Sequence, residues 1–201
     1  MRIRSIYFLP RHTEATAALL LFLFLLSSNA SAASGTGANE LWKALKAGTA
    51  FVVMRHAIAP GTGDPENFKL RDCSTQRNLS DQGREQARRA GRILRSHGVD
   101  EALIYSSQWC RCQETAKLLA VGQVRDLASL NSFYESYERR AEQTRHLKSW
   151  LGARPTGKPL ILVTHQVNIS ALTGNGTQSG EIVFVESTSK GGYSVLGRIV
   201  P

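Results

Sequence analysis

Residues 50–56 read AFVVMRH, and this stretch decides the fold class. Five apolar residues follow one another without a break, which is typical of a strand buried on both faces of a parallel sheet. Two similar runs come later, ALIY at 102–105 and PLILV at 159–163, and helix-like segments separate them. Strands that alternate with helices predict an α/β fold, a three-layer sandwich with a mostly parallel central sheet.

The segments around these runs complete the expected order of elements. Helices are expected over 40–47, 80–97, 109–120, 138–151 and 167–172, and late strands over 182–185 and 193–200. Ser80 is a typical helix N-cap, and Gly48 a typical helix end. Residues 57–78 are rich in Gly, Pro, Asp and Asn and predict a long loop, whereas 121–137 are expected to be irregular. The basic face of helix 80–97 is expected to be a solvated surface; it consists of Arg84, Arg88, Arg92 and Arg95.

The first 32 residues have the pattern of a secretory signal peptide. Arg2, Arg4 and Arg11 precede an apolar run at 17–26, and the small-residue segment SSNASA follows at 27–32. The apolar run is shorter than the ~20 residues that span a membrane, so we expect no stable span after cleavage. We therefore divide the chain into a signal peptide (1–32), a flexible leader at Ser34–Gly37 with a short helix (33–48), and one domain (49–201). The expected location is periplasmic or secreted.

Composition restricts the possible partners. The chain has 201 residues, 25 Lys plus Arg, 16 Asp plus Glu and a formal net charge of +9, with 42% hydrophobic residues. This composition is that of a globular protein and excludes wholesale disorder. The basic balance favours anionic partners. Nucleic acid is not expected, because no nucleic-acid-binding motif is present.

Three cysteines allow one disulfide in an oxidising compartment. Cys73 can pair with Cys110 or with Cys112, and the sequence leaves this choice open. A zinc site is not expected, because the C-x-C spacing lacks a second pair of ligands.

Polar side chains follow all three predicted central strands. Arg55 and His56 end the first, Ser106-Ser107 leads from the second to Arg111, and Thr164-His165 ends the third. Ligands of open α/β sheets bind beyond the carboxyl ends of the strands, so we expect two His and two Arg in one pocket. Guanidinium groups can hold phosphoryl oxygens, and a neutral imidazole can attack phosphorus. Such a site requires neither a metal nor another cofactor, since the cations are side chains. The remaining histidines of the domain, His97 and His146, are expected to be surface residues.

Four segments resemble the motifs of the histidine phosphatase superfamily, also called phosphoglycerate-mutase-like. They are VVMRHA at 52–57, NLSDQGREQA at 78–87, YSSQWCRCQETA at 105–116 and VTHQVNI at 163–169, in the family's order. The signal peptide and the R-H-A variant resemble a secreted branch that includes lipopolysaccharide core heptose phosphatase-like proteins. The resemblance implies the phosphoglycerate-mutase-like form of the three-layer fold.

The resemblance also implies roles for individual residues. His56 would be the phosphorylated nucleophile, Arg55 and Arg111 would clamp the phosphate, and His165 would hydrogen-bond the transferring group. Ser107, Gln166 and Arg77 are expected at the substrate: Ser107 would shape the turn before Arg111, and the backbone of Gln166 would contact the phosphate. Loop 57–78, with Lys69, Arg71 and Arg77, is expected to roof the pocket and select the substrate.

The general acid is the main departure from the family pattern. Where phosphoglycerate mutases carry an acidic residue, this chain has Ser132, and Gln166 replaces the Asp that follows the late His in acid phosphatases. Asp64, Asp126 and Glu135 are candidates, each expected to be an ordinary surface carboxylate. Without an acid, leaving groups of low pKa are favoured.

The expected function is a secreted or periplasmic, metal-independent phosphomonoesterase that works through phosphohistidine. A small phosphorylated substrate, such as a sugar or envelope glycan phosphate, is expected on family analogy. Two alternatives stay open: a non-catalytic phosphate- or glycan-binding module on the same fold, and a protein-phosphohistidine phosphatase. A mutase is disfavoured, because it needs a phosphate donor and the missing acid.

Overall fold

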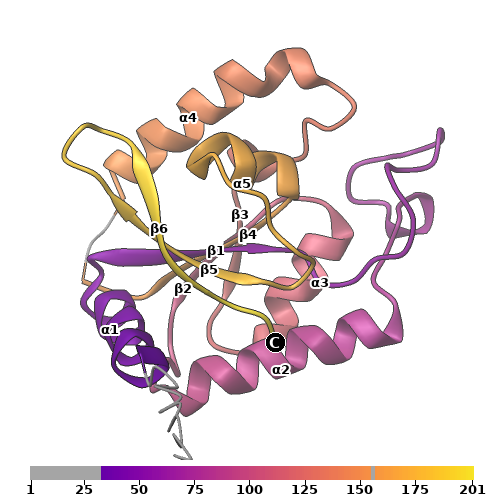
Figure 1. Cartoon of the computed structure of the whole chain (residues 1–201). Coiled ribbons are helices and arrows are strands. Elements are labelled where there is room, and N and C mark those ends of the chain that lie inside the picture. Colours follow the sequence, from indigo (N-terminus) through magenta and orange to yellow (C-terminus); the bar gives the residue numbers. More distant parts are fainter. Residues whose placement is uncertain (1–32, 155–156) are drawn as a thin grey trace, which may run out of the picture. The chain divides into compact units, whose positions relative to one another are not determined.

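The structure, a computed structural model, describes residues 33–154 and 157–201, and the expected signal peptide lies outside them. The described part of the chain forms one six-stranded sheet with helices on both faces (Figure 1). The strands are β1 (Ala50–Arg55), β2 (Leu103–Ser106), β3 (Val124–Asp126), β4 (Leu160–Thr164), β5 (Ile182–Ser187) and β6 (Tyr193–Ile199). The α-helices are α1 (Ala33–Ala47), α2 (Asp81–Ser96), α3 (Cys110–Leu119), α4 (Arg140–Gly152) and α5 (Gln166–Thr173). Short 3₁₀ turns are η1 (Cys73–Thr75), η2 (Ala128–Leu130) and η3 (Tyr137–Arg139).

The strand order is β3-β2-β4-β1-β5-β6, which confirms a mostly parallel sheet. Strands β3, β2, β4 and β1 pair in parallel, and β5 and β6 extend the sheet in antiparallel pairings. The three apolar runs singled out in the sequence are therefore the neighbours β2, β4 and β1. Their residues pack on both faces because successive side chains point to opposite sides of a strand.

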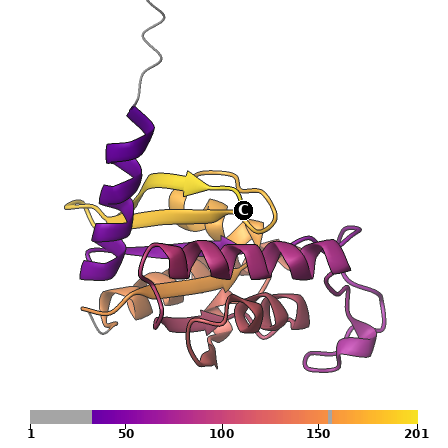
Figure 2. The same ribbon diagram turned by 90° about the horizontal axis from the view of Figure 1, so that it is seen from below.

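Two hydrophobic cores fill the spaces between the layers. One contains Val52 and Met54 of β1 together with buried residues of α1, α2 and α3. The other contains Phe51 and Val53 of β1 together with residues of α4 and α5. The ribbon has α4 and α5 on one side of the sheet and α1, α2 and α3 on the other (Figure 1), and α2 lies in front in the view from below (Figure 2). The expected three-layer sandwich is thus confirmed.

Three local differences separate the structure from the expectation. Ser34–Gly37, expected as a flexible leader, belongs to α1, because the packed part of the helix around Trp42 and Leu45 supplies a nucleus from which further turns extend. Strand β3 lies inside the segment expected to be irregular. Helix α4 begins two residues later than expected, after the 3₁₀ turn η3.

Helix α2 begins as its sequence predicts. The side chain of Ser80 accepts a hydrogen bond from the backbone of Gly83 at 3.1 Å, as an N-cap does. The expected solvated basic face is present in part: Arg88 and Arg92 are exposed, whereas Arg84 and Arg95 are half-buried, Arg84 paired with Glu114 of α3 and Arg95 bonded to the carbonyl of Leu119.

Candidate active site

The carboxyl ends of β1, β4 and β2 bring the predicted residues together. The backbone of His56 donates to the carbonyl of Thr164 at 2.9 Å, and the backbone of Ser107 donates to the carbonyl of Val163 at 2.9 Å. These bonds continue the sheet one residue past each strand. The residues that follow the three strands therefore meet at one edge of the sheet.

Six predicted site residues line one pocket of about 630 Å³, namely Arg55, His56, Arg77, Arg111, His165 and Gln166. The open side of the pocket is formed by exposed residues of the lining, namely Tyr134, Glu135, Tyr137, Arg139 and Arg140. Ser107 does not line it, and its residue is fully buried. Lys69 and Arg71, expected in the pocket roof, do not line it either, and Arg71 lies beside Asp126 elsewhere on the surface.

The ring of His56 is held in one tautomer. Its Nδ1 lies 2.8 Å from the carbonyl oxygen of Ala57. A carbonyl oxygen only accepts hydrogen bonds, so Nδ1 carries the proton and Nε2 keeps its lone pair. Burial lowers the pKa of His56 to about 3; the charges of Arg111 and Arg55 act in the same direction and the bond to Ala57 opposes them. The ring is therefore neutral over the physiological pH range, with the lone pair of Nε2 available.

His165 lies beside His56, and the two ring centres are 5.5 Å apart. Its Nε2 is 2.8 Å from Oγ of Ser107, which leaves Nδ1 for another partner. Burial lowers the pKa of His165 well below its usual value, and repulsion from His56 and Arg111 acts in the same direction. Ser107 thus acts on the site through His165.

Two guanidinium groups flank the histidines. One Nη of Arg55 donates to the side-chain oxygen of Gln166 at 3.1 Å, which places Gln166 at the pocket through its side chain. Arg111 is 2% exposed and forms a bidentate ion pair with Asp64. The Nε atoms of Arg55 and Arg111 are buried and have no hydrogen-bond partner within residues 33–154 and 157–201. Together these groups can hold an anion with several charge-assisted hydrogen bonds.

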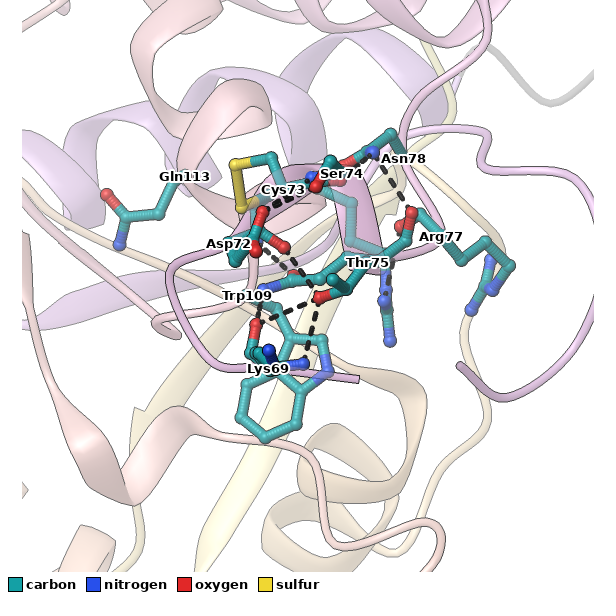
Figure 3. Close-up of a disulfide and its surroundings, with 12 residues drawn as sticks. Lys69, Asp72, Cys73, Ser74, Thr75, Arg77, Asn78, Trp109 and Gln113 are labelled. Carbon is teal, nitrogen blue, oxygen red and sulfur yellow. Dashed lines mark hydrogen bonds between the residues drawn. A yellow bond between two sulfur atoms is a disulfide. The ribbon is translucent and has the colours of Figure 1, made fainter. Parts of the chain in front are cut away.

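Loop 57–78 forms one wall of the pocket, as expected, with Gly61–Asp64, Phe68 and Arg77. A disulfide between Cys73 and Cys110 fastens it to the start of α3, which settles the open choice of partner. Figure 3 shows this disulfide beside the turn in which Ser74 donates to Asp72, with Arg77 and Trp109 nearby. Phe68 also stacks on Trp109, with ring centres 5.0 Å apart.

Cys112 remains a free, buried thiol, 3.5 Å from Nε2 of His165. Burial raises its pKa to about 12, so the sulfur stays protonated. It packs in the core and is no second nucleophile at neutral pH.

The motif residues on α2 and α3 support the segment that follows His56. A Cβ at Gly83 would lie 2.1 Å from the carbonyl oxygen of Ile58, so this helix residue must be glycine. The side chain of Gln86 accepts from the backbone of Ile58 at 3.1 Å and donates to Ser179 at 2.8 Å. Thr115 accepts from the backbone of Ala57 at 3.0 Å.

The three carboxylates proposed as acids differ in position. Asp64 is not a surface residue, since its side chain is 7% exposed and pairs with Arg111. Asp126 lies outside this pocket, and Glu135 is exposed at its rim. Ser132, at the position where mutases carry an acid, also lines the pocket.

Sequence reasoning missed the aromatic lining of the pocket. Trp109 packs edge-on against His165 with ring centres 5.5 Å apart. Tyr134 and Tyr137 line the open side and are 55% and 60% exposed. No local pattern marks these residues, because each reaches the pocket from an irregular segment or a helix end.

His97 and His146 lie away from the pocket. His97, expected to be a surface residue, is half-buried and stacks on Trp42 with ring centres 4.3 Å apart. His146 is exposed on α4.

Within the described residues, no group of three or more His, Cys, Asp or Glu side chains is arranged to hold a metal ion. No helix in the part of the chain that the structure covers is long and apolar enough to cross a membrane.

A neutral histidine that shares a pocket with two arginines, at the strand ends of a mostly parallel sheet, is an arrangement suited to phosphoryl transfer. The model of the histidine phosphatase superfamily (branch 1) matches residues 52–131, from β1 to the residue after η2. Over these residues, which are less than half of the chain, the sequence is similar to the histidine phosphatase superfamily. A comparison with curated proteins gives no match.

Solved structures of similar fold include phosphatases. The native mycobacterial glucosyl-3-phosphoglycerate phosphatase is 16% identical, with a TM-score of 0.54 over 73% of this chain and 96% of that one. The same mycobacterial enzyme in complex with VO3 is 17% identical, with a TM-score of 0.54 over 76% and 98% of the two chains. The protein histidine phosphatase SixA in complex with tungstate is 15% identical, with a TM-score of 0.53 over 76% and 97%. At these identities the likeness establishes the fold.

Proposed function

We propose that this chain is a metal-independent phosphomonoesterase that works through a phosphohistidine on His56. The observation that carries the proposal is the hydrogen bond from Nδ1 of His56 to Ala57, which leaves a neutral Nε2 in a pocket with Arg55, Arg111 and His165. A neutral imidazole in this setting needs no base to activate it.

The reaction proceeds in two displacements. Nε2 of His56 attacks phosphorus, the bond to the ester oxygen breaks, and the leaving group departs as an alkoxide or phenoxide that takes a proton from water. Water then attacks the phosphohistidine, which releases inorganic phosphate and regenerates the neutral ring. Arg55, Arg111 and His165 stabilise the charge on the equatorial oxygens during both steps.

The pocket supports a substrate much larger than inorganic phosphate. Its volume of about 630 Å³ falls in the range of pockets that bind drug-sized molecules. Tyr134 and Tyr137 offer exposed aromatic faces, and Arg139 and Arg140 lie beside them at the open side. These features favour a phosphorylated sugar or glycan whose ring packs on tyrosine and whose polar groups meet arginine.

A phosphohistidine protein is the second candidate substrate. Position 132 holds Ser instead of an acidic residue. A nitrogen leaving group needs protonation by an acid less than an alkoxide leaving group does. The fold neighbour SixA is itself described as a protein histidine phosphatase. The two candidates are separated by comparing a panel of sugar phosphates with a histidine-phosphorylated protein at equal concentrations.

A periplasmic or secreted location fits this function. The location is proposed because residues 1–32 have the pattern of a secretory signal peptide. The Cys73–Cys110 disulfide supports it, because disulfides persist in oxidising compartments. The substrate would then be met outside the cytoplasm, which favours an envelope glycan phosphate over a cytoplasmic relay protein. The proposal also agrees with the secreted branch that the sequence resembles.

The covalent step is tested by trapping. Wild-type mature protein mixed with an activated aryl phosphate and quenched in alkali is expected to carry one alkali-stable, acid-labile phosphoryl group. His56→Ala should carry none and should lose turnover, whereas His146→Ala, on the exposed face of α4, should behave as wild type. Turnover by His56→Ala at the wild-type rate would disprove the covalent mechanism. Phosphate binding without any turnover would establish the non-catalytic binding module instead.

A further inference from the structure

Asp64 is a buried carboxylate in the wall of the phosphate pocket, and neither a nucleophilic nor an acid role explains it. It lies in loop 57–78, 47 residues from Arg111 in the chain. The side chains of Asp64 and Arg111 are only 7% and 3% exposed. A charge that is buried to this degree requires several partners.

Four donors satisfy this carboxylate. Nη1 of Arg111 donates to Oδ1 at 2.6 Å, and Nη2 donates to Oδ2 at 3.0 Å. The indole of Trp109 donates to Oδ2 at 2.9 Å, and the backbone of Arg77 donates to Oδ1 at 3.2 Å. The carboxylate is thus fixed from the start of α3 and from its own loop.

This surrounding keeps Asp64 ionised. Burial by itself would raise the pKa of Asp64, but the hydrogen bonds and charge of Arg111, with the bonds from Trp109 and Arg77, bring it below its usual value. An ionised carboxylate with four donors has no proton for a leaving group. Asp64 is therefore unsuited to be the general acid.

The ion pair with Asp64 uses some of the N–H donors of Arg111 and leaves others unpaired. A guanidinium group has one bidentate edge at Nη1 and Nη2 and another that includes Nε. Asp64 occupies the first edge, while Nε of Arg111 is buried without a partner in the described residues. An unpaired buried donor is costly, and a phosphate oxygen would satisfy it.

Charge balance points the same way. Around the two histidines, Arg55, Arg77 and Arg111 bring three positive charges and Asp64 brings one negative charge, whereas Glu135, Arg139 and Arg140 lie at the exposed rim of the pocket. With both histidines neutral, the four inner groups leave a surplus of two positive charges, which matches a phosphate monoester with nearly two negative charges at pH 7. Without Asp64, three guanidinium groups would repel one another in a poorly solvated space.

We propose that Asp64 is a positioning residue for phosphate recognition, which holds the outer edge of Arg111 so that the Nε edge remains for the phosphate. This inference deepens the proposed function and rests on it. In the opposite role, Asp64 would compete with phosphate for Arg111, and its carboxylate would have to move away from Arg111 when phosphate binds. The four donors to Asp64 argue against such movement.

Binding of inorganic phosphate to the mature protein, measured by calorimetry, tests the inference without requiring turnover. Asp64→Asn keeps the shape of the side chain and removes its charge. It is expected to weaken phosphate binding at least tenfold, about 1.4 kcal/mol. The matched control is Asp126→Asn, which changes a carboxylate outside the pocket and should leave the affinity unchanged. Unchanged or tighter binding by Asp64→Asn would overturn the inference.

Kinetics separates positioning from proton donation. With Asp64→Asn, KM should rise by a similar factor for aryl and alkyl phosphates, since the anion is common to both. A loss confined to kcat for alkyl phosphates would identify Asp64 as the acid and overturn the inference.

Trp109→Phe serves as a second variant if Asp64→Asn does not fold. It removes one donor to Asp64 and keeps an aromatic ring between Phe68 and His165, so a rise in KM of a few-fold is expected. If the wild-type protein binds phosphate without turning substrate over, and Asp64→Asn binds phosphate more weakly, the proposed function is disproved and this inference is retained. A wild-type protein that binds no phosphate would disprove both.

Discussion

Nδ1 of His56 lies 2.8 Å from the carbonyl oxygen of Ala57, the next residue in the chain. The backbone itself therefore fixes the tautomer of the proposed nucleophile. Ala57 is in turn held by the hydrogen bond from its own N–H to Thr115 and is completely buried. The reactive nitrogen is thus set by the segment that leaves β1, and an acidic side chain is not needed to orient the ring.

Phosphorylation should occur on Nε2 of His56 and not on Nδ1. The trapped adduct, labelled with ¹⁵N in its histidines, is expected to show coupling of phosphorus to Nε2 in NMR spectra. Free histidine phosphorylated at Nδ1 and free histidine phosphorylated at Nε2 provide the two reference spectra. An adduct on Nδ1 would require the bond to Ala57 to break and would contradict the tautomer derived from the structure.

The buried histidines should make the fold sensitive to mild acid. Their folded-state pKa values are lowered, so the unfolded chain binds protons first as the pH falls below about 6.5. The free energy of unfolding should decrease from pH 6.5 toward 4.5, by up to about 1.4 kcal/mol per pH unit for each histidine. Urea unfolding at several pH values measures this slope. His56→Gln should reduce it, and His146→Gln should not; equal slopes in all three proteins would refute the prediction.

Gly83 should tolerate no side chain. A Cβ there would press against the carbonyl oxygen of Ile58 and push the segment after His56 out of place. Gly83→Ala is expected to lower stability by about 1–3 kcal/mol and to reduce kcat. Gly152→Ala is the control, because a Cβ at that position of α4 meets no neighbouring atom within 4 Å. A Gly83→Ala variant with full stability and activity would show that Ile58 moves freely.

The central sheet and the four main site residues could be predicted because their signals are local. A strand buried on both faces must be a continuous apolar run, and β1, β2 and β4 are such runs. His56 and His165 directly follow two of them. Strand β3 gave no such signal, since it is a three-residue edge strand in which Arg125 and Asp126 are exposed.

Contacts between distant segments could not be predicted in the same way. The pairing of Asp64 with Arg111 depends on how loop 57–78 folds back, and nothing near Asp64 in the sequence encodes that path. The disulfide follows the same rule. Cys110 and Cys112 are two positions apart on α3 and face different directions, so only the folded loop decides that Cys73 meets Cys110 while Cys112 packs in the core.

Loss of the disulfide should loosen the pocket wall. Cys73 and Cys110 are 37 residues apart, and a crosslink of this span stabilises a fold by about 3–4 kcal/mol in the chain-entropy model. Cys73→Ser combined with Cys110→Ser should lower the melting temperature and raise KM, because Asp64 and Arg77 lie in the same loop. Dithiothreitol should reproduce the effect in wild type and add nothing in the double variant. A double variant with wild-type KM would show that the loop is held by its other contacts.

The lack of an acid at position 132 should make the rate depend steeply on the leaving group. Ser132 lines the pocket, and Asp64 is held in its ionised form. Aryl phosphates should therefore react faster than alkyl phosphates by more than their difference in binding explains, and a plot of log kcat/KM against leaving-group pKa should have a strongly negative slope.

Ser132→Glu places a carboxyl group at that wall of the pocket. It should flatten the slope by raising alkyl phosphate turnover, within the 10²–10⁴-fold that proton transfer typically contributes. Ser136→Glu, which adds the same charge at another residue lining the pocket, controls for electrostatic effects on binding. A shallow slope in wild type would mean that another group protonates the leaving oxygen, with Glu135 at the rim as the next residue to substitute.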